Sequence, residues 1–218
     1  MLTLVINTSA SVESLALIEK QKILAEVIWK GNNDESEVLL KNLTQILKKA
    51  KKPLAKIQRI IAVCGPGPYS AVRIGVSVAN MLAFVLKAKL FSVDNRILWQ
   101  KRAPDKNAIC LLHAGGNYVL RFGSKTAAEI LPIQEALHSL ERPSIKLKAL
   151  AFYGDITENE HQEFEKFQKQ HPEWKFIPSE ELPSATQIIL KLPKKFLRPA
   201  HIITPLYLRP PLITPQKT

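Results

Sequence analysis

The chain has 218 residues, of which 46% are hydrophobic and 23% charged, a composition that excludes a disordered polymer and predicts one large or two small globular domains. Its two cysteines, Cys64 and Cys110, lie in apolar runs, which predicts buried thiols in a reducing compartment and excludes a disulfide framework. The N-terminus has no basic leader, and the most apolar stretch, residues 76–86, is shorter than the roughly 18–20 residues that span a bilayer. We therefore expect a cytoplasmic protein without a membrane segment.

The formal net charge of +12 is the one unusual feature of the composition. Six basic residues and no acidic residue fall between Lys48 and Arg59. A basic surface favours encounter with a polyanion such as RNA. The candidate RNA contacts are Lys48, Lys49, Lys51 and Lys52. A solvated lysine-rich face is the alternative, because no aromatic side chains are interleaved with these lysines as a platform for bases.

The chain opens with three predicted strands, at residues 2–8, 14–18 and 23–29. Short polar turns join them, which predicts an antiparallel meander. The D-x-x-E spacing of Asp34 and Glu37 then predicts the start of an amphipathic helix that extends to about residue 51.

A strand–helix–strand crossover follows. Residues 59–64 form a continuous apolar strand, residues 71–87 a helix, and residues 90–93 the returning strand. Because a meander and a crossover share this half, it predicts a mixed sheet flanked by helices.

A polar, basic stretch at residues 100–107 predicts a boundary between an N-terminal lobe, residues 1–99, and a C-terminal lobe, residues 100–218. The second lobe restarts with a hairpin that turns at Gly115-Gly116. Thr157 with Glu160 predicts a capped helix to about His171. The remaining elements expected here are a short helix at 133–140, a strand at 148–153, a last helix from Pro183 to Lys191 and an extended proline-rich tail from Pro193.

Catalytic motifs are scarce. The five histidines show no metal-ligand spacing, and the chain contains neither a nucleophile elbow nor a Walker loop. The turn between residues 65 and 70 precedes a helix, and free N–H groups there, with Arg73 one turn later, can attract an anion. The alternative is a stiff structural loop, because Pro66 and Pro68 lack the N–H donors that a phosphate cradle needs.

The helix at residues 71–87 is apolar on all sides, which predicts that it is covered on nearly every side. Gly75, Ala79 and Ala83 recur every four residues and form a small-residue ridge along one face. Such a ridge allows a second helix backbone to come close. The partner is then either a foreign helix or an element of the same chain.

The motifs LVINTS, IIAVCGPGPYSAVRIGVSVANMLAF, PSATQIIL and PLYLRPP occur in this order along nearly the whole chain. In this combination the sequence resembles the TsaB (YeaZ) family of bacterial tRNA threonylcarbamoyladenosine (t6A) synthesis. The resemblance implies an α/β chain with an actin/Hsp70-like (ASKHA) two-lobed fold, each lobe a mixed β-sheet flanked by helices. It further implies a non-catalytic scaffold subunit that binds a TsaD-like catalytic subunit, with a TsaE-like ATPase and tRNA joining the complex, and a homodimer when the chain is isolated.

Carried over by position, the docking helices are residues 34–51 and 71–87. The interface residues that the resemblance implies are Leu39, Leu43, Leu47, Gly75, Val78, Ala79 and Leu82. The weaker candidates for nucleotide binding are Thr8, Ser9, Gly65, Gly67 and Arg73.

The chain departs from the family pattern at the first of these motifs. Asn7 stands where the family usually has an aspartate that helps to hold nucleotide-bound magnesium, and an amide supplies no such charge. We therefore expect no metal and no tightly bound cofactor on this chain alone, and ATP with magnesium only at the level of the complex.

Two other functions remain open. One is a nucleotide-binding enzyme of the same superfamily, a kinase or hydrolase, which calorimetry with ATP and magnesium tests. The other is a stand-alone RNA-binding module, for which affinity falls steeply with salt.

Overall fold

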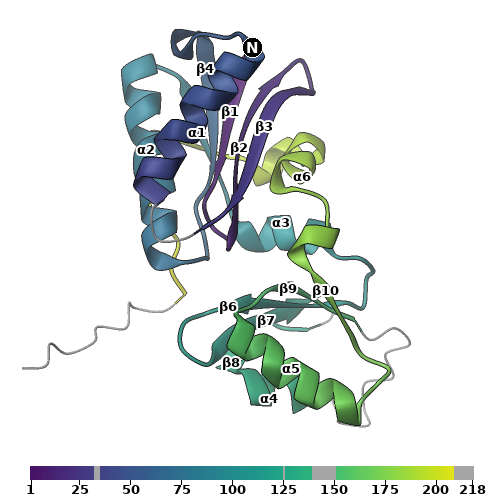
Figure 1. Cartoon of the computed structure of the whole chain (residues 1–218). Coiled ribbons are helices and arrows are strands. Elements are labelled where there is room, and N and C mark those ends of the chain that lie inside the picture. Colours follow the sequence, from purple (N-terminus) through teal and green to yellow (C-terminus); the bar gives the residue numbers. More distant parts are fainter. Residues whose placement is uncertain (32–34, 125, 139–150, 209–218) are drawn as a thin grey trace, which may run out of the picture. The chain divides into compact units, whose positions relative to one another are not determined.

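The computed structural model describes residues 1–31, 35–124, 126–138 and 151–208. The chain divides into two compact units (Figure 1), unit 1 with Met1–Arg102 and Pro183–Leu206, and unit 2 with Ala103–Leu182 and Tyr207–Thr218. The predicted boundary after residue 99 is close, but the sequence assigned everything beyond it to the second lobe. Pro183–Leu206 instead belongs to unit 1, because its last helix buries Ile188 and Ile189 in the core of that unit.

Unit 1 is built on a six-stranded mixed sheet with the strand order β11-β5-β4-β1-β2-β3. Its strands are β1 (Leu2–Asn7), β2 (Val12–Glu19), β3 (Lys22–Lys30), β4 (Ile57–Val63), β5 (Lys89–Val93) and β11 (Arg198–Ala200). β1, β2 and β3 pair antiparallel, while β4 pairs parallel with β1 and β5 parallel with β4. The predicted meander and crossover are both confirmed.

Helices cover both faces of this sheet (Figure 1). α1 (Glu35–Ala50) and α2 (Tyr69–Leu86) pack on one face, over a core that includes Leu4, Leu17 and Ile60. α3 (Asn95–Arg102) and α6 (Ala185–Lys191) pack on the other, over a core that includes Val5 and Ile61. The predicted start of the first helix at Asp34 lies outside the described residues.

Unit 2 contains a five-stranded sheet with the order β10-β9-β6-β7-β8. Its elements are β6 (Ile109–His113), β7 (Tyr118–Gly123), β8 (Glu129–Pro132), α4 (Ile133–His138), β9 (Ala151–Asp155), α5 (Glu158–Gln170) and β10 (Lys175–Pro178). The predicted hairpin is β6–β7, and the Thr157–Glu160 capping box opens α5. Phe152, Phe164 and Trp174 fill the core of the unit.

Some elements differ from the prediction. Residues 139–140 and 148–150 of two expected elements lie outside the described residues, as do residues 209–218 of the expected tail. The described part of that tail carries a short 3-10 turn (Lys194–Phe196) and the edge strand β11, where Pro199 is tolerated because an edge strand leaves one side unpaired. α3 was missed, although Asp94 accepts a hydrogen bond from the Arg96 backbone N–H at 2.8 Å and so caps it.

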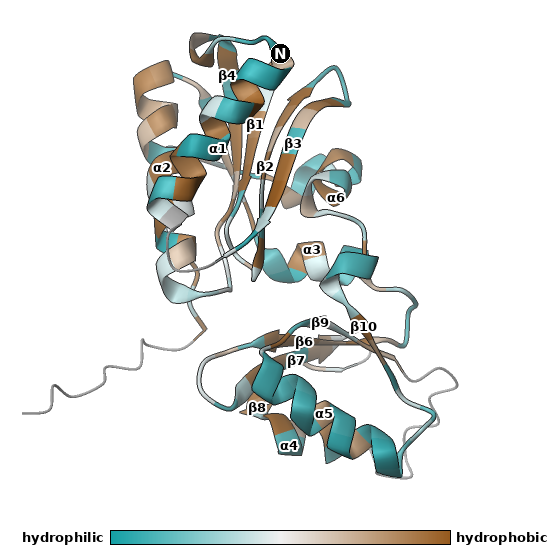
Figure 2. Ribbon diagram, viewed as in Figure 1, coloured by the Kyte–Doolittle hydropathy of each residue, from teal (hydrophilic) through white to brown (hydrophobic). Residues whose placement is uncertain are grey.

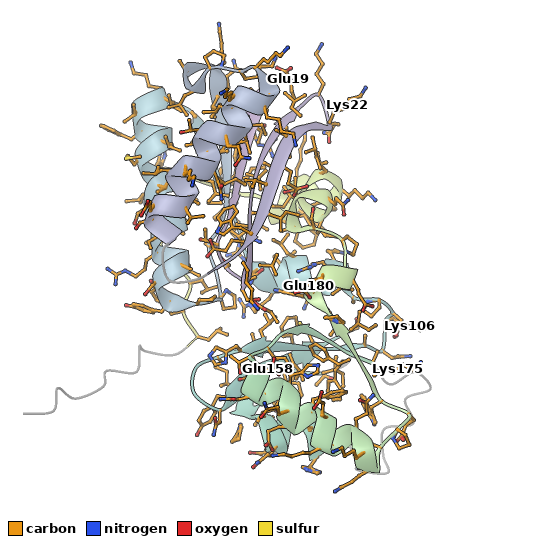
Figure 3. All side chains as sticks on the ribbon, viewed as in Figure 1. Glu19, Lys22, Lys106, Glu158, Lys175 and Glu180 are labelled. Carbon is orange, nitrogen blue, oxygen red and sulfur yellow. The ribbon has the colours of Figure 1, made fainter. Side chains whose placement is uncertain are left out.

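The β2–β3 turn gives a stability prediction. Lys20 and Gln21 occupy positive φ angles of 50° and 65° between Glu19 and Lys22, which Figure 3 labels. This backbone conformation favours glycine, because a Cβ atom clashes there. We expect Gln21→Gly to raise the free energy of unfolding by about 0.5–1 kcal/mol, measured by urea unfolding. Gln21→Ala is the control that gives no such gain, and an equal effect of both variants would contradict the assignment.

Candidate docking surface

The candidate nucleotide-binding residues do come together, at the ends of β1 and β4. Thr8 and Ser9 follow β1, and Gly65 and Gly67 follow β4. Thr8 and Ser9 are buried. A Cβ atom on Gly67 would lie 2.4 Å from the Ser9 carbonyl oxygen, so the two segments are in backbone contact.

The polar groups of these two segments bind one another. Thr8 Oγ1 donates to the Ala71 carbonyl at 2.7 Å, and Ser9 Oγ donates to the Val63 carbonyl at 3.0 Å. The Asn95 amide donates to the carbonyl oxygens of Ser9 and Pro66, at 2.7 and 2.8 Å. Each hydroxyl is therefore already used in holding the two loops together.

Asn7 takes part in the same network, because its Oδ1 accepts the Ser9 backbone N–H at 3.1 Å. Arg73 is apart from it: it is exposed, and its guanidinium lies 5.5 Å from the centroid of the Tyr69 ring. The hydroxyls of Thr8 and Ser9 are therefore not free to bind a nucleotide, and Asn7 supplies no carboxylate for magnesium. These hydrogen bonds fit the alternative of a stiff structural loop, and the anion site stays a prediction.

The small-residue ridge of α2 faces its own sheet and not a foreign helix. Gly75, Ala79 and Ala83 are all buried in unit 1. A Cβ atom on Gly75 would lie 2.2 Å from Thr8 Oγ1, so glycine allows the helix to approach the end of β1. The interpretation of this ridge as a surface for a partner is wrong.

Most of the interface residues that the resemblance implied are also buried in unit 1 and are not accessible to a partner. Leu39, Leu43, Gly75, Ala79 and Leu82 are buried, and Leu47 and Val78 are partly buried against the same core. The apolar side of each helix covers the sheet, because that contact removes the most hydrophobic surface from water.

A different set of side chains forms the exposed apolar surface of α2. Phe84 is 87% exposed, Val85 66% and Met81 50%. Spacings of three and four residues place the three side chains together on one side of the helix, and Figure 2 shows the hydrophobic colour on this C-terminal part of α2. Leu40 of α1 is also exposed. We call Met81, Phe84 and Val85 the α2 patch.

The sequence contained the signal for this patch. Phe84 is nine residues beyond Gly75, and nine residues are roughly two and a half helical turns. The two residues therefore lie on opposite sides of α2. Because the ridge packs on the chain's own sheet, Phe84 faces away from that sheet. The prediction that α2 is covered on nearly every side is therefore wrong at Phe84.

α2 is also the one helix among the described residues that is long and apolar enough to cross a membrane, with a mean hydropathy of 1.5 over Tyr69–Leu86. Its residues Val72, Val76 and Leu82 are buried in unit 1. Core helices of globular proteins share these properties, so length and composition alone are weak evidence for a span.

The four candidate RNA contacts lie at the end of α1 and just beyond it. Lys48, Lys49 and Lys51 are exposed. Lys52 differs from them, because its Nζ lies 2.9 Å from the Glu19 carboxylate, and this hydrogen bond lowers the pKa of Glu19. Three lysines are thus available to a polyanion, and the fourth ties the helix end to β2.

In unit 2, His113 is paired with a buried carboxylate. Its Nδ1 lies 2.8 Å from Oε1 of the buried Glu160, whose other oxygen accepts the Thr157 backbone N–H at 2.7 Å. The hydrogen bond with Glu160 raises the pKa of His113, and burial opposes it.

This pair predicts a pH dependence. Because the folded pKa of His113 is raised above the ordinary value of 6.5, its stabilising contribution is complete below pH 6.5 and is lost as the pH rises through the folded pKa. As the pH rises from 6.5 through the folded pKa of His113, we expect the free energy of unfolding of unit 2 to fall more in the parent than in His113→Gln. Urea unfolding followed at the Trp174 indole measures it. Equal slopes for both proteins would contradict the prediction.

Comparison with known proteins gives the following matches. The family model described as "TsaD: tRNA N6-adenosine threonylcarbamoyltransferase" matches residues 22–177. The tRNA threonylcarbamoyladenosine biosynthesis protein TsaB of Bacillus subtilis (strain 168) is 28% identical over 95 residues, which are 44% of this chain and 42% of that protein. The match thus spans less than half the length of this curated relative.

Two solved structures resemble the chain over most of its length. YeaZ from Pseudomonas aeruginosa has a TM-score of 0.57 at 19% identity, covering 87% of this chain and 89% of its own. A protein described as similar to peptidase YEAZ from Pseudomonas aeruginosa has a TM-score of 0.55 at 17% identity, covering 95% and 99%. Together with the two helix-flanked mixed sheets, they confirm the predicted two-lobed α/β fold.

Proposed function

The chain belongs to the family described as TsaD: tRNA N6-adenosine threonylcarbamoyltransferase, as a TsaB/YeaZ member, and from this premise we propose that it is a non-catalytic scaffold subunit of the t6A transferase complex. Its task is to bind and support a TsaD-like catalytic subunit. The protein acts in the cytoplasm, in an assembly that a TsaE-like ATPase and tRNA also join.

The observation that supports this proposal is the α2 patch. A Phe side chain that is 87% exposed loses about 1.5–3 kcal/mol of burial energy relative to a covered one. Contiguous exposed apolar side chains are typical of protein interaction surfaces. The patch lies on the helix that the family resemblance assigned to docking, although on its opposite side.

The structure of the two loops supports a role without chemistry on this chain. The hydroxyls of Thr8 and Ser9 donate to backbone carbonyls, so neither hydroxyl is free to donate to a phosphate. ATP with magnesium is accordingly expected on the assembled complex and not on this chain alone.

Co-elution tests the proposal. Mixed with a TsaD-like protein, the chain should elute as one species whose mass is the sum of the two subunits, while the isolated chain should form a homodimer through the same patch. Separate elution at micromolar concentrations would refute the scaffold role. Calorimetry of the isolated chain with ATP and magnesium tests the alternative, and magnesium-dependent binding with turnover would establish an enzyme instead.

A supporting RNA contact in the complex is also proposed, through the exposed lysines at the end of α1. Replacing Lys48, Lys49 and Lys51 by Gln should reduce the salt dependence of tRNA binding by the complex. Lys52→Gln alone is the matched control, because its charge is already paired with Glu19. Unchanged salt dependence of the triple variant would show that the cluster is only a solvated face.

A further inference from the structure

Unit 1 contains a pocket of about 240 Å³ on the face of the sheet opposite to α1 and α2. It lies where β1, β2 and β4 meet α6 and the segment after α6. The residues that line it are Met1, Thr3, Ile18, Lys20, Gln21, Arg59, Ile61, Ile189, Leu190, Leu192, Lys194 and Leu197. Neither the fold nor the proposed docking surface uses this pocket.

Arg59 is the central charged residue of the pocket. It projects from β4, next to Thr3 of β1 in the parallel register. Its Nε is buried without a hydrogen-bond partner, and its guanidinium carbon lies 4.9 Å from the centroid of the Phe91 ring. No carboxylate pairs with it among the described residues.

A half-buried guanidinium without a counter-ion carries a desolvation cost that no charge–charge attraction offsets. Burial lowers the pKa of Arg59, since removing the charge from water is unfavourable. The aromatic ring compensates only partly, because a cation–π contact is worth about 0.5–2 kcal/mol. An anion in the pocket would supply a counter-charge for the guanidinium and hydrogen-bond acceptors for its accessible N–H groups.

The rim of the pocket has the same sign of charge. Lys20 and Lys194 are exposed lining residues from opposite sides, the β2–β3 turn and the segment after α6, and no acidic residue lines the pocket. Three cations around one small cavity focus a positive potential on it.

The floor of the pocket is apolar. Ile18, Ile61 and Ile189 belong to the core beneath it. A ligand that fits must therefore combine a negative group for Arg59 with an apolar body for the floor. The volume corresponds to roughly eight water molecules, which is the size of a small organic acid.

We propose that this pocket binds a small organic carboxylate with a short, branched apolar body. The carboxylate accepts hydrogen bonds from Arg59, with the two lysines at the rim, and the apolar body covers the isoleucines. A nucleic-acid phosphate matches this site less well, because it would place charged oxygens against the apolar floor.

The test is an NMR titration of the labelled full chain with isocaproate, with isocaproamide as the neutral isostere and inorganic phosphate as a purely polar anion. We expect saturable shifts confined to the pocket with isocaproate, and at least about tenfold weaker binding of the other two compounds. Arg59→Met keeps the length and apolar contacts of the side chain, and we expect it to weaken isocaproate binding at least about tenfold.

Lys194→Met provides a second variant that does not depend on a buried position, with an expected weakening of about threefold. Lys195→Met is the matched control, because Lys195 is exposed and next in sequence but does not line the pocket. The proposal is overturned if isocaproamide or phosphate binds as tightly as isocaproate, if no compound gives saturable shifts, or if Lys194→Met binds isocaproate as tightly as Lys195→Met does.

Discussion

Phe84→Asp should strongly weaken binding of the chain to the proposed TsaD-like partner while leaving its fold intact. Phe84 is 87% exposed in the monomer, so a carboxylate there remains in water and costs the fold of the monomer little. In the complex the same carboxylate would be buried against an apolar surface without a counter-ion. We expect a loss of at least about 2 kcal/mol, or roughly thirtyfold in affinity, measured by calorimetry.

Ile202→Asp is the control for this variant. Ile202 is also an exposed apolar residue of unit 1, but it does not lie on α1 or α2. The Ile202→Asp variant should bind the partner with the same affinity as the parent. Equal losses for the two variants would show that added negative charge weakens binding from anywhere on the unit, and an unaffected Phe84→Asp would remove the α2 patch from the interface.

Gly75→Leu should strongly destabilise unit 1 and not merely block docking. A Cβ atom at this position would lie 2.2 Å from Thr8 Oγ1 and 3.2 Å from Thr8 Cβ. Thr8 is fully buried and donates to the Ala71 carbonyl, so it has no room to move. Overpacking of a core typically costs about 1–3 kcal/mol, and the remaining atoms of leucine should take the loss to about 3 kcal/mol or more, measured by urea unfolding.

Ser77→Leu places the same side chain on the exposed side of the same helix. Its free energy of unfolding should stay within about 0.5 kcal/mol of the parent. Should Gly75→Leu prove as stable as Ser77→Leu and yet fail to bind the partner, the ridge would be an external contact after all.

Much of the fold could be predicted because local chemistry decides it. Alternation and turns placed β1, β2 and β3, and the spacing of Thr157 and Glu160 placed the start of α5. Tertiary contacts decided the rest. α3 carries Arg96, Lys101 and Arg102 and reads as a polar linker, yet its Leu98 and Trp99 are buried.

The proposed docking surface lies on a helix that the resemblance assigned to docking, but on the side opposite to the residues it implied. A helix that is apolar all round does not reveal which side meets the sheet, and a Gly/Ala ridge suits a sheet as well as a foreign helix. The decisive contact is between Gly75 and Thr8, residues that are distant in sequence. Composition and periodicity do not reveal such a contact. Once the Gly75 side of α2 is known to face the sheet, the position of Phe84 on the opposite side of the helix follows.

The central claim is that the α2 patch becomes covered when the partner binds, and methionine oxidation tests it directly. The chain has two methionines: Met81 lies in the patch and is 50% exposed, and Met1 is 57% exposed. Met1 lines the pocket on the other face of the sheet, so it serves as the internal control. Oxidised at high dilution, the isolated chain should react at both residues. Addition of the TsaD-like partner should slow Met81 several-fold and leave Met1 unchanged, whereas equal oxidation of Met81 with and without a bound partner would contradict the account.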